Sequence, residues 1–291
     1  MTRKHSIGLF GIVAAGIAAA LLVTERRRAL RAAPRNVEHR EPERVTTNLM
    51  MAGLTTAVTH VAMTPVVEPL TRWVVRERVG LTQRLPIPRW LRDALAVLLL
   101  DYTLYWWHVV EHRIPALYRF HQVHHADLEL DVSTGARFHF GEFITSVPWR
   151  AAQVVVIGAS PRALGLWQRL TMLSVMFHHS NVRLPLGVEH VLARIIMTPR
   201  LHGIHHSIVA EEQNANWSSG LTLWDRLHGT YRANVPQQEI EMGVPAYREP
   251  EDVNLPRSLT MPLRPLPPWR LPDGTIPRHL QTPAPTNRLL P

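Results

Sequence analysis

Histidines at short, regular spacing dominate the middle of this chain. The first of three groups is a polar stripe on an otherwise apolar segment, and the other two share the pattern H-x-x-H-H. The groups are Asp101, Tyr105, His108 and His112; then His121, His124 and His125; then His202, His205 and His206. Residues three and four positions apart lie on one face of a helix, so each group presents its side chains together.

This crowding predicts metal binding. Clustered histidines would repel one another if protonated and would leave ring nitrogens unpaired if buried. Neutral imidazole is a common ligand of iron, copper and zinc. With no cysteine in the chain, any ligand must be nitrogen or oxygen. One zinc ion takes about four ligands, so the eight histidines of these groups indicate two metal ions with open positions.

The charge pattern indicates a membrane rather than a nucleic acid as partner. The formal net charge is +9, and Lys4 is the only lysine, so arginine carries the excess. The arginines flank apolar runs, and the sequence has no recognisable nucleic-acid-binding motif. We therefore expect no nucleic-acid partner.

Several apolar segments could position the histidines at a membrane. Residues 6–23 are uncharged and about as long as a bilayer is thick, and arginines follow at once, which favours an anchor with that side in the cytoplasm. A cleaved signal peptide is the alternative. Residues 46–68 form a second candidate span, interrupted near Pro65, that either crosses fully or re-enters.

The remaining apolar segments return the chain to the histidine side. Residues 90–110 are the third candidate span, and residues 142–157 and 163–177 are predicted to form a hairpin around Gly158 and Pro161. Residues 72–92 are rich in arginine and suggest an interfacial segment. We expect an all-α integral membrane bundle of four to five segments with a cytoplasmic, histidine-rich helical cap.

The apolar segments and the histidine groups divide the chain into three expected parts. Residues 1–45 would be an N-terminal membrane anchor with a basic linker, and residues 46–234 would be the membrane-embedded metal domain. Residues 235–291 are rich in proline, which sustains neither helices nor inner strands, so we expect an extended or disordered tail.

The motifs resemble those of the fatty acid hydroxylase superfamily of membrane di-iron enzymes, which includes sterol desaturases, sterol C-4 methyl oxidases and alkylglycerol monooxygenase. The resemblance covers residues 101–231 and is carried by several motifs in the family's order. They are DYTLYWWHVVEH (101–112), HQVHH (121–125), RFHFGE (137–142), FHHSN (177–181), TPRLHGIHH (198–206) and NANWSSGLTLWDRLHGTY (214–231). The spacing HVVEH lacks the arginine common in the family's first motif.

The resemblance implies a set of site residues. The eight histidines named above would bind two irons, with His139 and His179 as further ligands and His178 as a weaker candidate. Residues that would orient the ligands through hydrogen bonds are Asp101, Glu111, Glu142, Asn181, Asn216 and Asp225, and Glu142 could instead join a metal. No catalytic group beyond the metal ligands and no binding site for an organic cofactor is assigned.

The implied activity is O2-dependent hydroxylation or desaturation of a lipid: a sterol, fatty acyl chain, carotenoid or ether lipid. Two irons would be the cofactor, with zinc possible in purified protein. Electrons would come from an external ferredoxin or cytochrome b5 type donor, since no flavin, haem or iron–sulfur motif is visible. The arginine and alanine bias suggests a bacterial inner membrane. A zinc-dependent membrane hydrolase and a metal-binding or transport protein are the alternatives.

Overall fold

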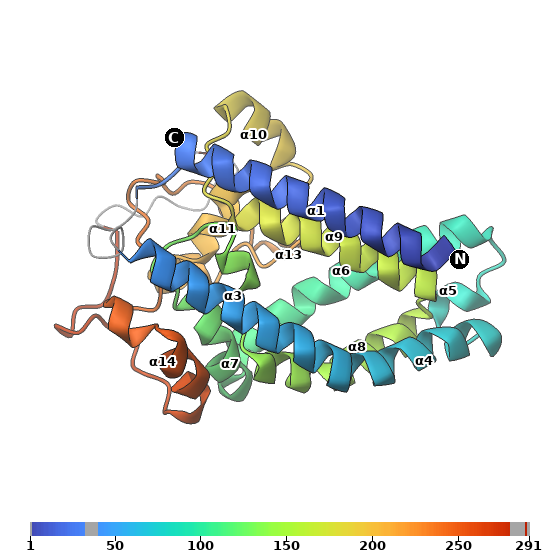
Figure 1. Ribbon diagram of the computed structural model, residues 1–291. Coiled ribbons are helices and arrows are strands. Elements are labelled where there is room, and N and C mark those ends of the chain that lie inside the picture. The colour runs from blue at the N-terminus through green and yellow to red at the C-terminus, as the bar shows by residue number, and fades with distance from the viewer. Residues whose placement is uncertain (1, 33–39, 280–288, 290–291) are drawn as a thin grey trace.

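The computed structural model describes residues 2–32, 40–279 and 289, and within these ranges every regular element is a helix (Figure 1). The all-α prediction is confirmed. The longer helices are α1 (Thr2–Arg27), α3 (Glu41–Val58), α4 (Thr64–Arg76), α6 (Arg89–Arg113), α7 (Pro115–His125), α8 (Phe140–Ile157) and α9 (Pro161–His179). The shorter helices used below are α5 (Leu81–Arg84), α11 (Pro199–His205), α13 (Leu223–His228) and α14 (Leu255–Thr260).

The long helices extend between two ends of the molecule, and different short helices and connections lie at each end (Figure 1). Helices α7, α11, α13 and α14 gather at one end, which we call the cap. Helix α5 and the connection between α8 and α9 lie at the other, which we call the distal end (Figure 1). The chain therefore carries all of its H-x-x-H-H motifs to one end.

Proline and small polar residues decide where the helices of the site begin. Pro115 ends α6, because the residue before a proline is disfavoured in helical conformation, and Ile114 is extended there. Pro115 also starts α7, since its missing N–H is not needed in the first turn. Thr198 caps α11 by accepting a hydrogen bond from the Leu201 N–H.

Two helical stretches are long and apolar enough to cross a membrane by length and composition, residues 8–27 and residues 41–84. Of the four to five spans predicted, these two meet that description among the described residues. The second contains the predicted interruption, but as a π-helical turn at Thr59–Met63, and the helix continues through Pro65. The predicted third span is helix α6, which is largely covered by its neighbours.

Helices α8 and α9 do not pack as a simple hairpin. Helix α6 contacts both of them, and the apolar core of this half includes Leu100, Trp107, Val154 and Trp167. Gly158 ends α8 and begins the turn to α9, and its φ of 78° lies in the left-handed region that favours glycine.

The C-terminal segment differs from the predicted tail in its described part. Trp269 donates its ring N–H to the Ile208 carbonyl, and Val253 and Met261 are buried against α3 and α7. Helix α14 forms here because Asn254 caps its first turn. Proline prevents long helices, but short turns still bury apolar side chains. Residues 280–288, 290 and 291 of the predicted tail lie outside the described residues.

Candidate metal centre

The structure gathers nine of the ten predicted histidine ligands into two adjacent groups. In each group the ring nitrogens that could bind a metal lie within 4.8 Å of one another. The five-histidine group is His108, His112, His121, His125 and His205, and the four-histidine group is His124, His179, His202 and His206. All nine come from the cap end of the bundle.

Helical spacing sorts these side chains between the groups. His121 and His125 of α7 are four residues apart and enter the five-histidine group, whereas His124 points to the four-histidine group. In α11 the division is the reverse, since His205 joins the five and His202 joins the four. Each H-x-x-H-H motif therefore serves both groups.

Ring nitrogens face each other at short range within the groups. His108 Nε2 lies 3.0 Å from His205 Nε2, and His124 Nε2 lies 3.0 Å from His179 Nε2. Two nitrogens bound to one metal at about 2.1 Å and at right angles would be about 3.0 Å apart. The spacing is that of ligands around a shared ion.

Backbone carbonyls fix the tautomer of the facing pair in the five-histidine group. His108 Nδ1 lies 2.7 Å from the Trp217 carbonyl, and His205 Nδ1 lies 2.9 Å from the Ala215 carbonyl. A carbonyl only accepts, so both Nδ1 atoms carry the proton. Both Nε2 atoms then present lone pairs to each other with no proton between them.

The same arrangement occurs in the four-histidine group. His124 Nδ1 donates to the Arg137 carbonyl at 3.2 Å, and His179 Nδ1 donates to the Val175 carbonyl at 2.8 Å. Their facing Nε2 atoms are therefore also unprotonated. Protein atoms alone leave two lone-pair repulsions in the centre of the cap.

Extra protons do not resolve these repulsions near neutral pH. Burial lowers the pKa of His205 to about 3, and it lowers the pKa values of His124, His202 and His206 well below their ordinary range. The neighbouring histidines oppose protonation further. The rings are neutral at pH 7, as metal ligands must be.

Unpaired ring nitrogens complete the test of the site for a metal. His112 Nε2, His125 Nδ1 and His202 Nδ1 are buried and have no hydrogen-bond partner. A buried polar atom without a partner costs about 1–3 kcal/mol, and a cation bound at His112 Nε2 would remove this cost for that atom. The donor set therefore fits two metal ions held by imidazole nitrogen, one in each group.

Two buried carboxylates adjoin the five-histidine group. Glu142 Oε2 lies 3.4 Å and Glu111 Oε2 lies 3.9 Å from His121 Nδ1. The structure brings these two predicted residues together with His121 as a cluster. Burial and the neighbouring Glu142 raise the pKa of Glu111 well above its ordinary value, so the two side chains together carry less than two full negative charges beside His121.

Asp225 and Asn216 act on the ligands through the loop that carries Ala215 and Trp217. The Asp225 carboxylate accepts from the Trp217 and Ser218 N–H groups, at 2.8 and 3.1 Å. Asn216, at a φ of 54°, donates to the carbonyls of Leu201 and Arg232. These bonds hold the two carbonyls that orient His205 and His108.

The other predicted residues lie outside the two groups. His139 caps α8, with Nδ1 accepting from the Gly141 N–H and Nε2 3.3 Å from the Leu259 carbonyl, so both nitrogens have backbone partners. His178 stacks beside His202 without joining a group. Asp101 accepts from the Trp224 ring N–H and the Leu221 N–H. It ties α6 to the region of α13.

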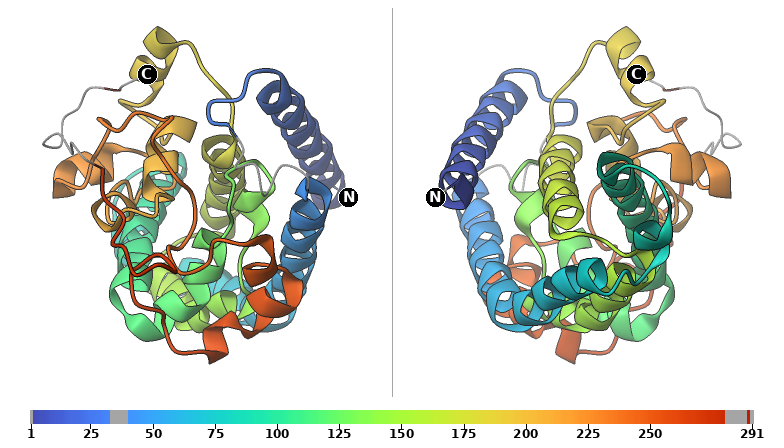
Figure 2. Two further views of the ribbon diagram at one scale, coloured as in Figure 1. Left: turned by 90° about the vertical axis from the view of Figure 1, so that its left-hand side faces the viewer. Right: turned by 90° about the vertical axis from the view of Figure 1, so that its right-hand side faces the viewer.

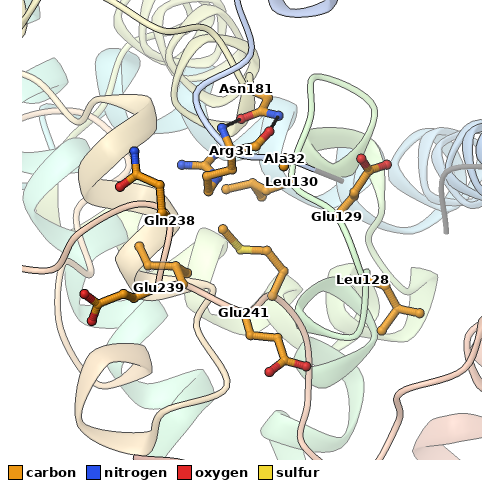
Figure 3. Close-up of a pocket in the computed structure, with 11 residues that line it drawn as sticks. Arg31, Ala32, Leu128, Glu129, Leu130, Asn181, Gln238, Glu239 and Glu241 are labelled. Carbon is orange, nitrogen blue, oxygen red and sulfur yellow. Dashed lines mark hydrogen bonds between the residues drawn. The ribbon is translucent and has the colours of Figure 1, made fainter. Parts of the chain in front are cut away.

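Asn181 holds the chain that follows α1 rather than a histidine. It lines a pocket of about 290 Å³, where its side chain accepts from the Arg31 N–H and donates to the Arg31 carbonyl (Figure 3). The Arg31 guanidinium in turn donates to the carbonyl of Pro199, the first residue of α11. Asn181 therefore reaches the ligand helix through Arg31.

Two arginines that position the histidine-bearing segments are not predicted from the sequence. Arg31 lies against Gly203, where a Cβ atom would come within 2.4 Å of its Nη1. Arg137 is fully buried and donates to Asn48 and to the Val123 carbonyl, while its own carbonyl accepts from His124. The position of Arg137 in the RFHFGE motif is the signal that could have identified it. No local signal identifies Arg31.

Comparisons with known proteins agree with the histidine motifs. Residues 94–230 match the family model described as fatty acid hydroxylase. Ornithine lipid hydroxylase OlsE of Rhizobium tropici is 31% identical over 54% of this chain and 46% of its own length. Alkylglycerol monooxygenase of Homo sapiens is 27% identical over 47% of this chain and 30% of its own. Cholesterol 25-hydroxylase of Mus musculus is 28% identical over 48% and 46%.

The matched region extends over both histidine groups and the Asp225 loop, and it spans less than half of the length of each of these relatives. No solved structure is significantly similar to this chain. The resemblance that the motifs indicated is confirmed by these matches: residues 94–230 are similar to the fatty acid hydroxylase family.

Proposed function

We propose that this chain is a membrane di-iron oxygenase that hydroxylates or desaturates a C–H bond of a lipid. The observation that carries the proposal is the pair of facing, unprotonated Nε2 atoms in each histidine group, 3.0 Å apart. Imidazole-rich sites without thiolate suit iron, copper and zinc. Relatives that are named as lipid hydroxylases and a monooxygenase favour iron among these.

Two iron ions, when bound, supply O2-dependent removal of hydrogen from an unactivated C–H bond, with an alcohol or an alkene as product. The protein would hold them with the five and the four histidines. Backbone carbonyls keep four of these rings in the tautomer that leaves Nε2 free for a metal: His108, His205, His124 and His179. Glu142 and Glu111 orient His121. The buried cap around the rings excludes water from the reacting centre.

Exposed apolar side chains on the long helices support a lipid environment. Leu9, Ile12 and Val13 of α1 face outward, as do Leu49 and Met50 of α3. Such surfaces suit lipid tails better than water. We propose that these helices lie in a bilayer with the cap on its cytoplasmic side, in a bacterial inner membrane, and that the substrate tail reaches the metals from the bilayer.

The proposal includes a separate electron donor of ferredoxin or cytochrome b5 type. Activation of O2 at iron requires reduction, and the cap supplies imidazole and carboxylate groups that bind metal without carrying electrons themselves. The donor would approach the cap from the aqueous side. The substrate is a sterol, a fatty acyl chain, a carotenoid or an ether lipid, and product analysis identifies which of these is oxidised.

The test is turnover of a membrane lipid extract by purified protein with a chemical reductant and isotopically labelled O2. We expect product from wild type and none from His124→Ala/His205→Ala, which removes one ligand from each group. Label in the product identifies hydroxylation, and loss of two hydrogens identifies desaturation. Hydrolysis products without O2 consumption would support the zinc hydrolase, and metal uptake without turnover would support the binding or transport protein.

A further inference from the structure

The distal end of the bundle is a second specialised surface, far from the histidines (Figure 2, right). It forms where two connections meet. Thr82 and Gln83 of α5 donate to the Gly158 carbonyl, at 3.0 and 2.7 Å, and Ser160 donates to Asp93 of α6 at 2.6 Å. These bonds fix the segment from α4 to α6 against the turn between α8 and α9.

Arginine is concentrated on this end. Seven arginines come from α4, α5, α6, their connections and the start of α9, and three carboxylates lie among them, which leaves an excess of four positive charges. The arginines are Arg72, Arg76, Arg78, Arg84, Arg89, Arg92 and Arg162, and the acids are Glu68, Glu77 and Asp93. All of the arginines except Arg92 are exposed.

Large apolar side chains are exposed between these arginines. Trp90 is 65% exposed and Leu81 is 54% exposed, and Trp73, Val75 and Leu91 are also exposed. Tryptophan mixed with arginine is typical of the headgroup region of a bilayer, where the ring meets the acyl boundary and the cation meets phosphate. A nucleic-acid surface would not explain the exposed leucines.

We propose that the distal end binds the headgroups of anionic phospholipids. Arginine suits this partner because its planar guanidinium pairs with phosphate oxygens. If the bundle spans the bilayer, this end emerges opposite the cap, where the positive-inside rule predicts few arginines. Lipid binding accounts for their presence there. The inference requires the membrane location alone and is independent of oxygenase activity.

The experiment is competition between phosphatidylglycerol and phosphatidylcholine for the full chain in a neutral detergent, with bound lipids counted by native mass spectrometry. We expect wild type to prefer phosphatidylglycerol. In Arg76→Gln/Arg84→Gln/Arg89→Gln the preference should fall by at least tenfold, since each arginine near an anionic surface contributes about fivefold. High salt should weaken the wild-type preference in the same way.

The matched control is Arg257→Gln/Arg264→Gln/Arg270→Gln, which removes the same charge from exposed positions in the C-terminal segment. This variant should keep the preference, and both variants should keep the wild-type metal content. An unchanged preference in the distal variant would overturn the proposal. Equal loss in the two variants would do the same, because it would show that only total charge matters. Salt-insensitive binding would also contradict it.

Discussion

The two histidine groups are built from shared helices but differ in their charged surroundings. In the five-histidine group, Glu142 and Glu111 lie 3.4 and 3.9 Å from His121. In the four-histidine group, no carboxylate joins the histidines among the described residues. The first metal position has carboxylates directly beside His121, whereas at the second Asp127 and Asp131 act on His179 from outside the group.

This difference predicts that two metal ions bound in these groups would not be equivalent. Neutral ligands leave the full charge of a cation in a buried site, which is costly, whereas nearby carboxylates reduce the cost. We therefore expect the five-histidine group to hold its ion more tightly and to fill first. A carboxylate that adjoins a ligand also raises its basicity.

Removal of one ligand from each group should give the largest effect and should separate the groups. His205→Ala removes a ligand from the five and His202→Ala from the four. Turnover should be lost in both, since one metal alone does not complete the centre. Metal analysis should show that His202→Ala keeps about one tightly held ion, because the carboxylates beside the five-histidine group remain, and that His205→Ala lowers both occupancies. Equal retention by both variants would break the comparison.

Substitution of the carboxylate should give a smaller, one-sided effect. Glu142→Gln keeps the shape of the side chain and removes its charge, so metal affinity at the five-histidine group should fall about 10–100-fold. Metal titration would measure this. Glu68→Gln, at an exposed distal position, is the control and should change nothing. An equal fall at both metal positions would contradict the assigned asymmetry.

The loop that orients His108 and His205 offers a test at Asp225, a residue that acts on these histidines only through the backbone. Asp225→Asn retains one acceptor oxygen but places an NH2 against either the Trp217 or the Ser218 N–H. Loss of a charged acceptor from buried donors costs about 1–3 kcal/mol. We expect weaker metal binding in the five-histidine group and little change in the four, because the latter is oriented by the Arg137 and Val175 carbonyls. The same titration measures both sites.

Acid should destabilise the metal-free cap, with a small effect per pH unit for each histidine. The pKa of His205 is lowered from 6.5 to about 3, so between these values the unfolded chain binds more protons than the folded one. Stability therefore falls as pH falls through this window, by up to about 1.4 kcal/mol per pH unit for each such histidine. Thermal melting of metal-free protein against pH checks this. His205→Asn should give a shallower slope, and a Tm independent of pH would contradict the prediction.

The sequence predicted the helices, and it singled out nine histidines that the structure brings together, because both depend on local spacing. The spacing of His121, His124 and His125 places all three on one side of a helix, and Pro115 marks where that helix starts. The sequence could not show how the histidines divide between two groups, since that depends on how α7 and α11 face each other. His139 fits a ligand motif but is used as a helix cap, which only the turn before α8 reveals.

Residues that act through others were the hardest to predict. Arg31 lies 168 positions from Pro199, whose carbonyl it contacts, so no spacing in the sequence connects them. Asn181 was expected beside a ligand and instead fixes Arg31. The described part of the proline-rich segment packs on the cap because Val253 and Met261 find apolar partners from α3 and α7. The proline content indicates that long helices cannot form here, but it does not indicate which apolar side chains of other helices this segment packs against.

The metal content of the full chain, purified in mild detergent after growth with iron, is the most direct test of a di-iron centre. We expect about two iron ions per chain, in line with two groups of four and five imidazoles. We also expect their loss, together with O2 consumption under reducing conditions, in His124→Ala/His205→Ala. Stoichiometric zinc in place of iron, with no O2 consumption by the wild type, would contradict a di-iron centre.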